Sequence, residues 1–232
     1  MKLYRVYIDS THIDLILDWL PGGDLSGRQL KLGRYEEREV AKLIYSLLET
    51  LVYLHKMGIM HRDIKPANIL MSSNSSDTKI VLGDFGVSSH IFNKLNSRVF
   101  CGTIGYLAPE MFTGSYNELV DEYGVGLVLY KLLAGVAPFS ARNEEEMLSR
   151  NRFGVISFDH DLCSRVTSEA RILILNLTKK DPKLRPSAKE ALNHPWFVKM
   201  RVIPENKRTV SSRWSSFSSE LSFLISASSS CL

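Results

Sequence analysis

The sequence predicts an α+β fold, in which two short strands precede a larger, mainly α-helical region. Residues 3–20 contain two runs rich in β-favouring residues, separated by the turn-forming Asp9-Ser10-Thr11. From residue 35 onward the apolar residues recur with the period of about 3.6 residues that is typical of helices. The composition fits this interpretation, because 44% hydrophobic and 23% charged residues are typical of a globular protein.

Net charge, cysteine content and hydropathy exclude several classes of protein. The formal charge of +4 is too small and too evenly spread to indicate nucleic-acid binding. The three cysteines match neither a zinc site nor a disulfide framework, so we expect a reducing compartment, either the cytoplasm alone or the cytoplasm together with the nucleus. The start of the chain has no apolar signal-peptide core. The most apolar stretch, residues 125–139, carries Lys131 in its middle and is too short to span a membrane.

The first predicted helix covers Tyr35 to Lys56. Pro21-Gly22-Gly23 ends the extended structure before it, and Gly58 is a natural C-terminal stop after it. Its apolar residues form one stripe on the helix surface. They are Val40, Leu43, Ile44, Leu47, Leu48, Leu51 and Leu54. Short apolar pairs with turn residues follow, from Ile59 to Val87.

The second half of the chain predicts more helices. Val120 to Ala134 is apolar nearly all round, which is typical of a helix buried at the centre of a domain. Further helices are expected over Asn143 to Arg150 and Thr167 to Thr178, and after the capping box Ser187-Ala188-Lys189-Glu190.

The carboxyl end differs in composition from the rest. Serine accounts for 11 of the last 22 residues. We therefore expect a disordered tail over residues 199–232. The alternative is a regulatory segment whose aromatic residues dock on the domain.

The residues that indicate chemistry lie in two short loops after the first long helix. His61-Arg62-Asp63-Ile64-Lys65-Pro66-Ala67-Asn68 comes first, and Asp84-Phe85-Gly86 follows. The oxygen-bearing side chains of Asp63, Asn68 and Asp84 suit magnesium, and Lys65 suits a phosphoryl group. Asp63 is then left to orient a substrate hydroxyl and receive its proton. Positioning and charge neutralisation are most of what phosphoryl transfer requires.

These motifs, followed in order by Ala108-Pro109-Glu110, resemble the eukaryotic protein kinase family over residues 3–198. The resemblance implies a protein-kinase-like α+β fold, with a complete, mainly helical C-terminal lobe, a two-stranded remnant of the N-terminal lobe, and the hinge between them. Residues 1–198 would form the catalytic domain. Three further segments are most similar to the calcium/calmodulin-dependent kinase group: Gly22-Gly23-Asp24, Cys101-Gly102-Thr103 and His194-Pro195-Trp196-Phe197.

The resemblance implies an ATP- and Mg²⁺-dependent kinase that phosphorylates Ser and Thr residues of protein substrates. Asp63 resembles the catalytic base, and Lys65 resembles the lysine that contacts the transferred phosphate. Asn68, also in the catalytic loop, and Asp84 resemble the magnesium ligands. Lys65 and Thr103 indicate specificity for Ser and Thr over Tyr.

The resemblance also assigns nucleotide-binding and structural residues. Asp18 to Leu20 would form the hinge, whose backbone binds adenine. Leu70 would form the floor beneath the base, and Asp24 would meet the ribose or a basic substrate residue. Two structural roles are implied as well: Glu110 would pair with Arg185 inside the domain, and Asp121 would hold the catalytic loop through backbone hydrogen bonds.

The sequence departs from the family pattern before residue 3. The Gly-rich loop, the strand lysine and its partner glutamate are not found in the 232 residues. We expect a fragment of a longer kinase, with at most weak activity by itself. The alternative is a truncated, inactive kinase-like protein that acts as a binding or regulatory module. A small-molecule phosphotransferase is disfavoured by the peptide-positioning segment from Cys101 to Glu110.

Three single positions bear on regulation and specificity. Val99 lies where many relatives carry an activating phosphothreonine, so Arg62 would lack a phosphate partner. Ala67 and Lys131 stand where arginine-directed kinases often have acidic residues, which argues against a strong preference for basic substrates. The expected partners are protein substrates and an upstream kinase or a calmodulin-type regulator, without nucleic acid and without a membrane span.

Overall fold

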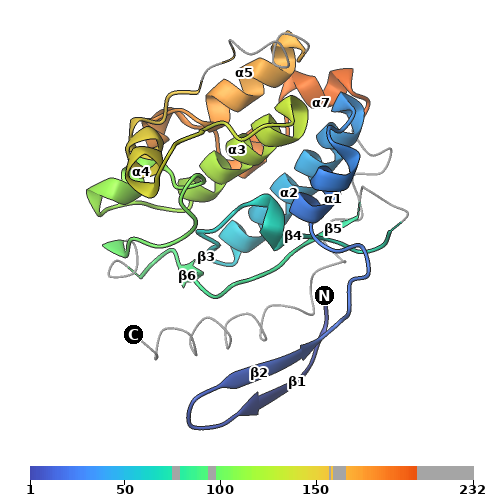
Figure 1. The fold of residues 1–232 in the computed structure, drawn as a ribbon, viewed down its shortest axis with the longest axis vertical. Helices are drawn as coiled ribbons and strands as arrows, with labels where there is room; N and C mark the ends of the chain where they lie inside the picture. The colour runs from blue at the N-terminus through green and yellow to red at the C-terminus, as the bar shows by residue number, and fades with distance from the viewer. Residues whose placement is uncertain (75–78, 94–97, 157, 159–165, 203–232) are drawn as a thin grey trace.

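The computed structural model describes residues 1–74, 79–93, 98–156, 158 and 166–202. Figure 1 shows a β-hairpin that projects from one end of a larger, mostly helical body. The predicted α+β organisation is therefore confirmed for this part of the chain. Of the tail predicted over residues 199–232, residues 203–232 lie outside the described residues. Lys199 is the last residue of a helix, and Met200 and Val202 pack against the core, so these three residues belong to the ordered body.

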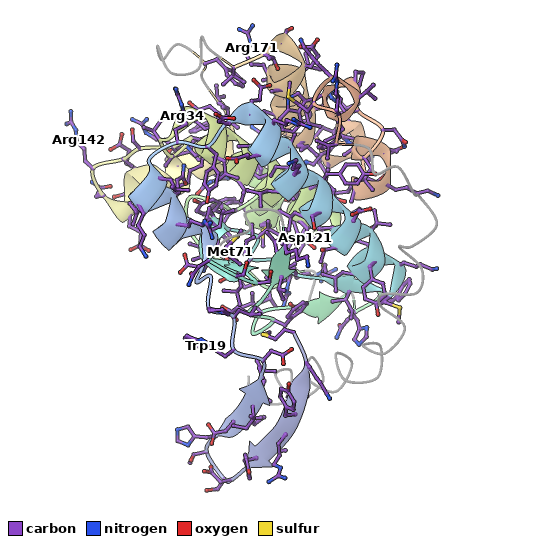
Figure 2. The ribbon with its side chains drawn as sticks, turned by 90° about the vertical axis from the view of Figure 1, so that its right-hand side faces the viewer. Trp19, Arg34, Met71, Asp121, Arg142 and Arg171 are labelled. Carbon is purple, nitrogen blue, oxygen red and sulfur yellow. The ribbon has the colours of Figure 1, made fainter. Side chains whose placement is uncertain are left out.

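The hairpin consists of β1 (Leu3–Ile8) and β2 (Ile13–Leu17), paired antiparallel with Ile8 opposite Ile13. The carboxylate of Asp9 closes the turn, because it accepts hydrogen bonds from the backbone N–H groups of Thr11 and His12 at 2.6 and 2.8 Å. Trp19, which lies between the hairpin and the body, points into solvent (Figure 2) and is 87% exposed.

Two helices follow the hairpin. Sequence analysis assigned no element to α1 (Leu25–Leu32), a short helix with a glycine in its first turn. Its N-cap is Asp24, whose side chain accepts a hydrogen bond from the N–H of Gly27. The next helix, α2 (Glu37–Lys56), begins two residues later than predicted. All the residues of its predicted apolar stripe are buried, so the predicted face is confirmed.

Short strands between α2 and α3 flank the loops that contain the predicted site residues. Strand β3 (Ile59–Met60) pairs antiparallel with β6 (Ser89–His90), and β4 (Ile69–Met71) pairs antiparallel with β5 (Ile80–Leu82). A turn of 3-10 helix, Pro66–Asn68, precedes β4. A longer 3-10 segment, Pro109–Thr113, precedes α3.

Helix α3 (Leu119–Ala134) is the centre of the helical body. It is buried on all sides, as predicted, and it packs against α2 and α5 (Ser168–Leu177). The remaining helices are α4 (Glu144–Phe153), α6 (Ala188–Ala191) and α7 (Pro195–Lys199). Within the described ranges, no helix combines the length and the apolarity that a membrane crossing requires.

Two glycines in α3 allow other segments to approach its backbone closely. A Cβ atom on Gly124 would lie 2.8 Å from the Cβ of Ile64, in the loop that carries Asp63. A Cβ atom on Gly126 would lie 2.5 Å from Cγ2 of Thr178, at the end of α5. The absence of side chains at these two positions therefore sets the depth at which the catalytic loop and α5 pack on α3.

This packing predicts opposite effects for two glycine-to-alanine substitutions. Gly126→Ala should lower the free energy of unfolding by about 1–3 kcal/mol, because the added methyl group overfills a packed core. Gly27→Ala in α1 is the matched control. The added Cβ atom would lie 3.7 Å from an Asp24 carboxylate oxygen, an ordinary contact distance, so the better helix former should raise stability by about 0.5–1 kcal/mol. Urea titration followed by circular dichroism measures both, and equal stability of the two variants would contradict the packing argument.

Candidate active site

The loop that carries Asp63 is held from below by a carboxylate at the start of α3. Asp121 accepts hydrogen bonds from the backbone N–H groups of His61 and Arg62, at 2.8 and 2.7 Å. Asp121 is buried, and Figure 2 shows it inside the helical body. The role predicted for Asp121 is confirmed. These bonds also fix Arg62 in the left-handed region, at φ 69°, where a residue other than glycine is seldom found.

Three predicted catalytic residues meet within this loop. Oδ2 of Asp63 lies 2.7 Å from Nζ of Lys65 and 3.0 Å from Nδ2 of Asn68. Asn68 also donates to the backbone carbonyl of Asp63, at 2.9 Å. Oδ1 of Asp63 is buried and has no hydrogen-bond partner among the described residues. One oxygen of this carboxylate is thus anchored, and the other is left without a protein donor.

The β4–β5 pair brings Asp84 beside Asn68. Ile69 pairs with Leu82, and just beyond this pair the N–H of Gly83 donates to the carbonyl of Asn68 at 2.8 Å. Asp84 follows directly, with φ 58°, and is exposed. On the other side of this segment, the ring of His61 packs against Phe85 at 4.9 Å between centroids. The structure therefore places all four predicted residues of the phosphoryl-transfer site in one region.

The donor set at Asn68 and Asp84 fits a magnesium ion. The amide nitrogen of Asn68 is used by Asp63, which leaves its side-chain oxygen for a cation. Asp84 supplies a carboxylate from the adjoining segment and uses Oδ1 only for the N–H of Gly86, at 3.2 Å. Magnesium in proteins is commonly bound through one or two side-chain oxygens together with substrate phosphates. Across the described part of the chain, no cluster of three His, Cys, Asp or Glu residues forms a larger metal site.

The predicted hinge residues lie where the hairpin joins the helical body. The carboxylate of Asp18 accepts hydrogen bonds from the N–H of Lys2 and the hydroxyl of Tyr4, at 2.6 and 2.7 Å. These bonds hold the pKa of Asp18 below its usual value. The N–H of Asp18 donates to the carbonyl of Lys2 at 3.0 Å, and the carbonyl of Leu20 accepts from the N–H of Gly23 at 3.4 Å. The groups predicted to bind adenine are therefore the carbonyl of Asp18 and the N–H of Leu20. This contact stays a prediction.

Asp24 and Leu70 lie opposite each other, joined by an isolated antiparallel bridge. Leu70 is on β4 and is half-buried, so it is available as an apolar floor. One oxygen of Asp24 caps α1 by accepting from the N–H of Gly27 at 2.9 Å. Asp24 therefore has a structural role that sequence analysis did not assign, and its predicted contact with ribose or substrate stays a prediction.

Lys65 connects the catalytic loop to the segment that precedes Ala108-Pro109-Glu110. Its Nζ atom lies 2.6 Å from Oγ1 of Thr103 as well as 2.7 Å from Asp63. The side chain is 20% exposed. Because one ammonium group binds both, the position of Thr103 is coupled to that of the Asp63 carboxylate.

Tyr116 is a site residue that sequence analysis missed. Its hydroxyl donates to the carbonyl of Val99 at 2.6 Å and accepts from the guanidinium of Arg62 at 3.1 Å. Arg62 also donates to the carbonyl of Val87, at 2.5 Å. Burial raises the pKa of Tyr116 to about 12, so the hydroxyl keeps its proton. The neutral Tyr116 side chain thus links Arg62 to the backbone at Val99, the position at which many relatives carry a phosphothreonine.

The predicted pair of Glu110 and Arg185 is confirmed, although the two residues are far apart in the chain. The guanidinium is bidentate, with N–O distances of 2.6 and 3.1 Å to the two carboxylate oxygens. The Arg185 side chain is fully buried, and it also donates to the backbone carbonyls of Leu119 and Lys179. The pair therefore ties the 3-10 segment Pro109–Thr113 to the start of α3 and to the loop after α5.

A second buried charge cluster surrounds His55. Its Nε2 atom lies 2.9 Å from Oδ2 of Asp121, and its Nδ1 atom lies 3.3 Å from Oε1 of Glu122. Burial by itself would lower the pKa of His55, but the hydrogen bonds to the two carboxylates outweigh it and raise the pKa to about 10. Glu122 also accepts from the N–H of Ala188, at 2.8 Å. The cluster thus joins α2, α3 and α6 beneath the catalytic loop.

The anchor pair predicts a large loss of stability when one partner is removed. Arg185→Ala should lower the free energy of unfolding by about 3–5 kcal/mol, because Glu110 is then left charged and buried. The matched control is Lys199→Ala, which removes an exposed pair with Glu169 whose N–O distance is 2.8 Å. We expect the control to unfold at nearly the wild-type temperature in differential scanning calorimetry. Similar melting temperatures for both variants would show that burial does not distinguish the two pairs.

The His55 cluster predicts a defined dependence of stability on pH. Because folding raises the pKa of His55 from 6.5 to about 10, its contribution is complete below pH 6.5 and is lost as the pH rises toward 10. In His55→Gln this contribution is absent, so the difference in unfolding free energy from wild type should shrink between these two pH values. His12→Gln, in the exposed hairpin turn, should follow the wild-type curve. A difference between wild type and His55→Gln that is constant with pH would contradict the charged cluster.

Comparison with known proteins agrees with this geometry. The protein kinase domain family matches residues 1–197 of the chain. The chain is 35% identical over 201 residues to calcium-dependent protein kinase 5 of Plasmodium falciparum (isolate 3D7), covering 87% of this chain and 35% of that protein. It is 34% identical over 207 residues to calcium/calmodulin-dependent protein kinase type 1 of Macrobrachium nipponense, covering 89% and 60%.

A plant relative shows the same pattern. Calcium-dependent protein kinase 4 of Arabidopsis thaliana is 36% identical over 207 residues, covering 88% of this chain and 41% of that protein. The chain thus spans between 35% and 60% of the length of these relatives. The expected similarity to calcium- and calmodulin-dependent kinases is confirmed. With a family match over nearly all the described residues and the family's motifs assembled around Asp63, the chain belongs to the protein kinase family.

Proposed function

We propose that this chain forms the catalytic lobe of an ATP-dependent protein kinase that phosphorylates Ser and Thr residues. The observation that carries the proposal is the Asp63 carboxylate. One of its oxygens is fixed by Lys65 and Asn68, and the other is buried without a partner among the described residues. Such an oxygen is suited to accept a hydrogen bond from a substrate hydroxyl, since an unsatisfied buried acceptor is otherwise costly.

The proposed reaction transfers the γ-phosphoryl group of ATP to the substrate oxygen. Asp63 orients the Ser or Thr hydroxyl and receives its proton as the new O–P bond forms and the bond from the γ-phosphorus to the bridging oxygen of ADP breaks. Lys65 lies beside the same carboxylate and places a positive charge next to the transferred group. Thr103, bound to Lys65, holds the peptide-positioning segment against this centre.

Magnesium fits the proposed reaction through Asn68 and Asp84. When bound, it would neutralise charge on the nucleotide phosphates. The role of these two residues is to present side-chain oxygens from two segments that the hydrogen bond from Gly83 to Asn68 keeps adjacent. The backbone of Asp18 and Leu20, together with Leu70, would receive the adenine base.

Regulation by a calmodulin-type protein or by an upstream kinase belongs to the same proposal. It is supported by the names of the relatives, which describe calcium-dependent and calcium/calmodulin-dependent kinases. Val99 has no hydroxyl that could carry a phosphate, and Tyr116 already joins the carbonyl of Val99 to Arg62, so the proposal favours a calmodulin-type regulator.

The proposal is tested by Asp63→Asn. The amide cannot accept the proton in the same way, so kcat should fall by about 10²–10⁴-fold while the protein remains folded. Phosphate transfer from radiolabelled ATP to a mixed Ser/Thr peptide library, with magnesium present, measures the effect. Asp14→Asn, on the exposed face of the hairpin, is the matched control and should retain the wild-type rate.

Two outcomes of this assay would contradict the proposal. A wild-type rate in Asp63→Asn would remove Asp63 from the chemistry. If the wild-type protein bound peptides and transferred no phosphate, the chain would instead act as a kinase-like binding module.

A further inference from the structure

Asn151 is a buried polar residue in the last turn of helix α4. The structure describes all ten residues of this helix, and among them only Asn151 is buried, with an exposed fraction of 0%. Asparagine is mostly found on protein surfaces, and it is a weaker helix former than alanine or leucine. Neither the stability of the helix nor the burial of apolar surface therefore accounts for this residue at this position.

Both ends of the Asn151 amide are bonded to one short piece of backbone. Its Oδ1 atom accepts a hydrogen bond from the N–H of Gly105 at 2.5 Å, and its Nδ2 atom donates to the carbonyl of Leu107 at 3.3 Å. These partners fix the orientation of the amide, because a backbone N–H can only donate and a carbonyl can only accept. A carboxylate could make only the first bond, and an apolar side chain could make neither.

Other contacts hold α4 against the same segment. A Cβ atom on Gly105 would lie 4.0 Å from the sulfur of Met147, which is one helical turn before Asn151. Just after the helix, a Cβ atom on Gly154 would lie only 2.8 Å from Cγ of Pro109. The helix therefore packs along this segment, and the Asn151 amide adds two hydrogen bonds within the contact.

The conformation of this segment makes support from outside important. Gly105 has φ 97°, in the region that favours glycine, and residues 103–107 belong to no helix or strand. Such a segment has no regular ladder that would satisfy its backbone N–H and C=O groups. The amide of Asn151 takes the place of a neighbouring strand for one N–H and one carbonyl. The solvent-facing sides of residues 103–106 stay accessible, because these residues are only half-buried.

The supported segment reaches the catalytic centre through Thr103. Tyr106, between the two residues that Asn151 binds, donates its backbone N–H to the carbonyl of Thr103 at 2.9 Å. The Thr103 hydroxyl lies 2.6 Å from Nζ of Lys65, which in turn contacts Asp63. A shift of the segment would therefore move Thr103 relative to the proposed acceptor site.

We propose that Asn151 is a positioning residue of the peptide site, which holds the backbone of residues 105–107 in the conformation that receives the protein substrate. This inference rests on the proposed function, because it assigns the peptide to this segment. A segment that is already fixed loses less conformational freedom when a peptide binds, so the affinity is higher. Asn151 acts through the segment, since its own side chain is fully buried.

The position of Asn151 predicts an effect on the peptide and none on the nucleotide. The proposed magnesium ligands, Asn68 and Asp84, are held together by the β4–β5 pair and by the bond from Gly83, apart from the backbone that Asn151 binds. Loss of the amide should therefore raise the KM for the peptide more than it lowers kcat, and it should leave the KM for ATP unchanged. A general loss of stability would produce no such split.

Two variants of Asn151 and one control test the inference in the full chain. Asn151→Ala removes both bonds, adds no bulk and favours the helix, so the protein should fold. Asn151→Asp keeps the acceptor for Gly105 and places its second oxygen opposite the carbonyl oxygen of Leu107. Asn193→Ala is the matched control, because it removes an exposed amide that donates to the carbonyl of Lys189 at 3.1 Å.

Peptide binding and hydrogen exchange are measured without requiring turnover. Fluorescence anisotropy gives Kd for fluorescein-labelled members of a mixed Ser/Thr peptide library. Both variants should bind these peptides about tenfold more weakly than wild type, the scale of one net hydrogen bond. Mass spectrometry should show faster amide exchange in residues 101–107 of the variants and wild-type exchange in α2 and α3. Asn193→Ala should match wild type in both measurements.

The outcomes separate this inference from the proposed function. Wild-type peptide affinity in Asn151→Ala, an equal loss of ATP affinity, or faster exchange throughout the helical body would each contradict the inference. It also fails if neither variant folds, because Asn151 would then be a core residue, or if wild type binds no library peptide. If the variants lose peptide affinity as expected and wild type transfers no phosphate, the role of Asn151 stands and the proposed function fails. Phosphate transfer by wild type with unchanged peptide binding in the variants gives the reverse result.

Discussion

The buried carboxylate of Asp121 accepts hydrogen bonds from the backbone of His61 and Arg62 and pairs with the ring of His55. The geometry of the catalytic loop depends on these bonds, because a short loop without regular structure has no ladder of its own to satisfy its N–H groups. Burial opposes the charged form of Asp121, and the hydrogen bond from His55 lowers its pKa in spite of this. The loop is therefore fixed to the most deeply buried helix of the domain.

Close packing around α3 explains why so few contacts are enough to position the site. Gly124 lets the loop at Ile64 lie against the α3 backbone, and the Asp121 carboxylate then reaches the two N–H groups above it. Farther along the chain, Glu110 and Arg185 tie the 3-10 segment Pro109–Thr113 to the same helix through the carbonyl of Leu119. The loop that carries Asp63 and the segment before Ala108-Pro109-Glu110 thus share one support, and Lys65 joins them directly at Thr103.

The charged groups of the site are nearly all paired, and one carboxylate oxygen without a partner marks where the substrate is proposed to bind. Arg185, His55 and Lys65 each contact at least one carboxylate. Oδ1 of Asp63 is buried and has no hydrogen-bond partner among the described residues. It would receive the substrate hydroxyl. A buried polar atom without a partner is unfavourable in the free protein, so its retention fits a role in binding.

The sequence by itself determined the features that depend on neighbouring residues. The apolar period of α2, the buried character of α3 and the oxygen-bearing residues of the two loops were all predictable, because periodicity and motif chemistry are local properties. The resemblance to the kinase family added the pair of Glu110 with Arg185. Only the tertiary structure decided that Tyr116 binds Arg62 and that Asp24 caps a helix. It also decided that His55 contacts both Asp121 and Glu122. The contact between Lys131 and Tyr106 was likewise not predictable from the sequence. Most of these contacts join residues that are distant in the sequence, and helix packing alone sets which side chains meet and which charges remain without a partner.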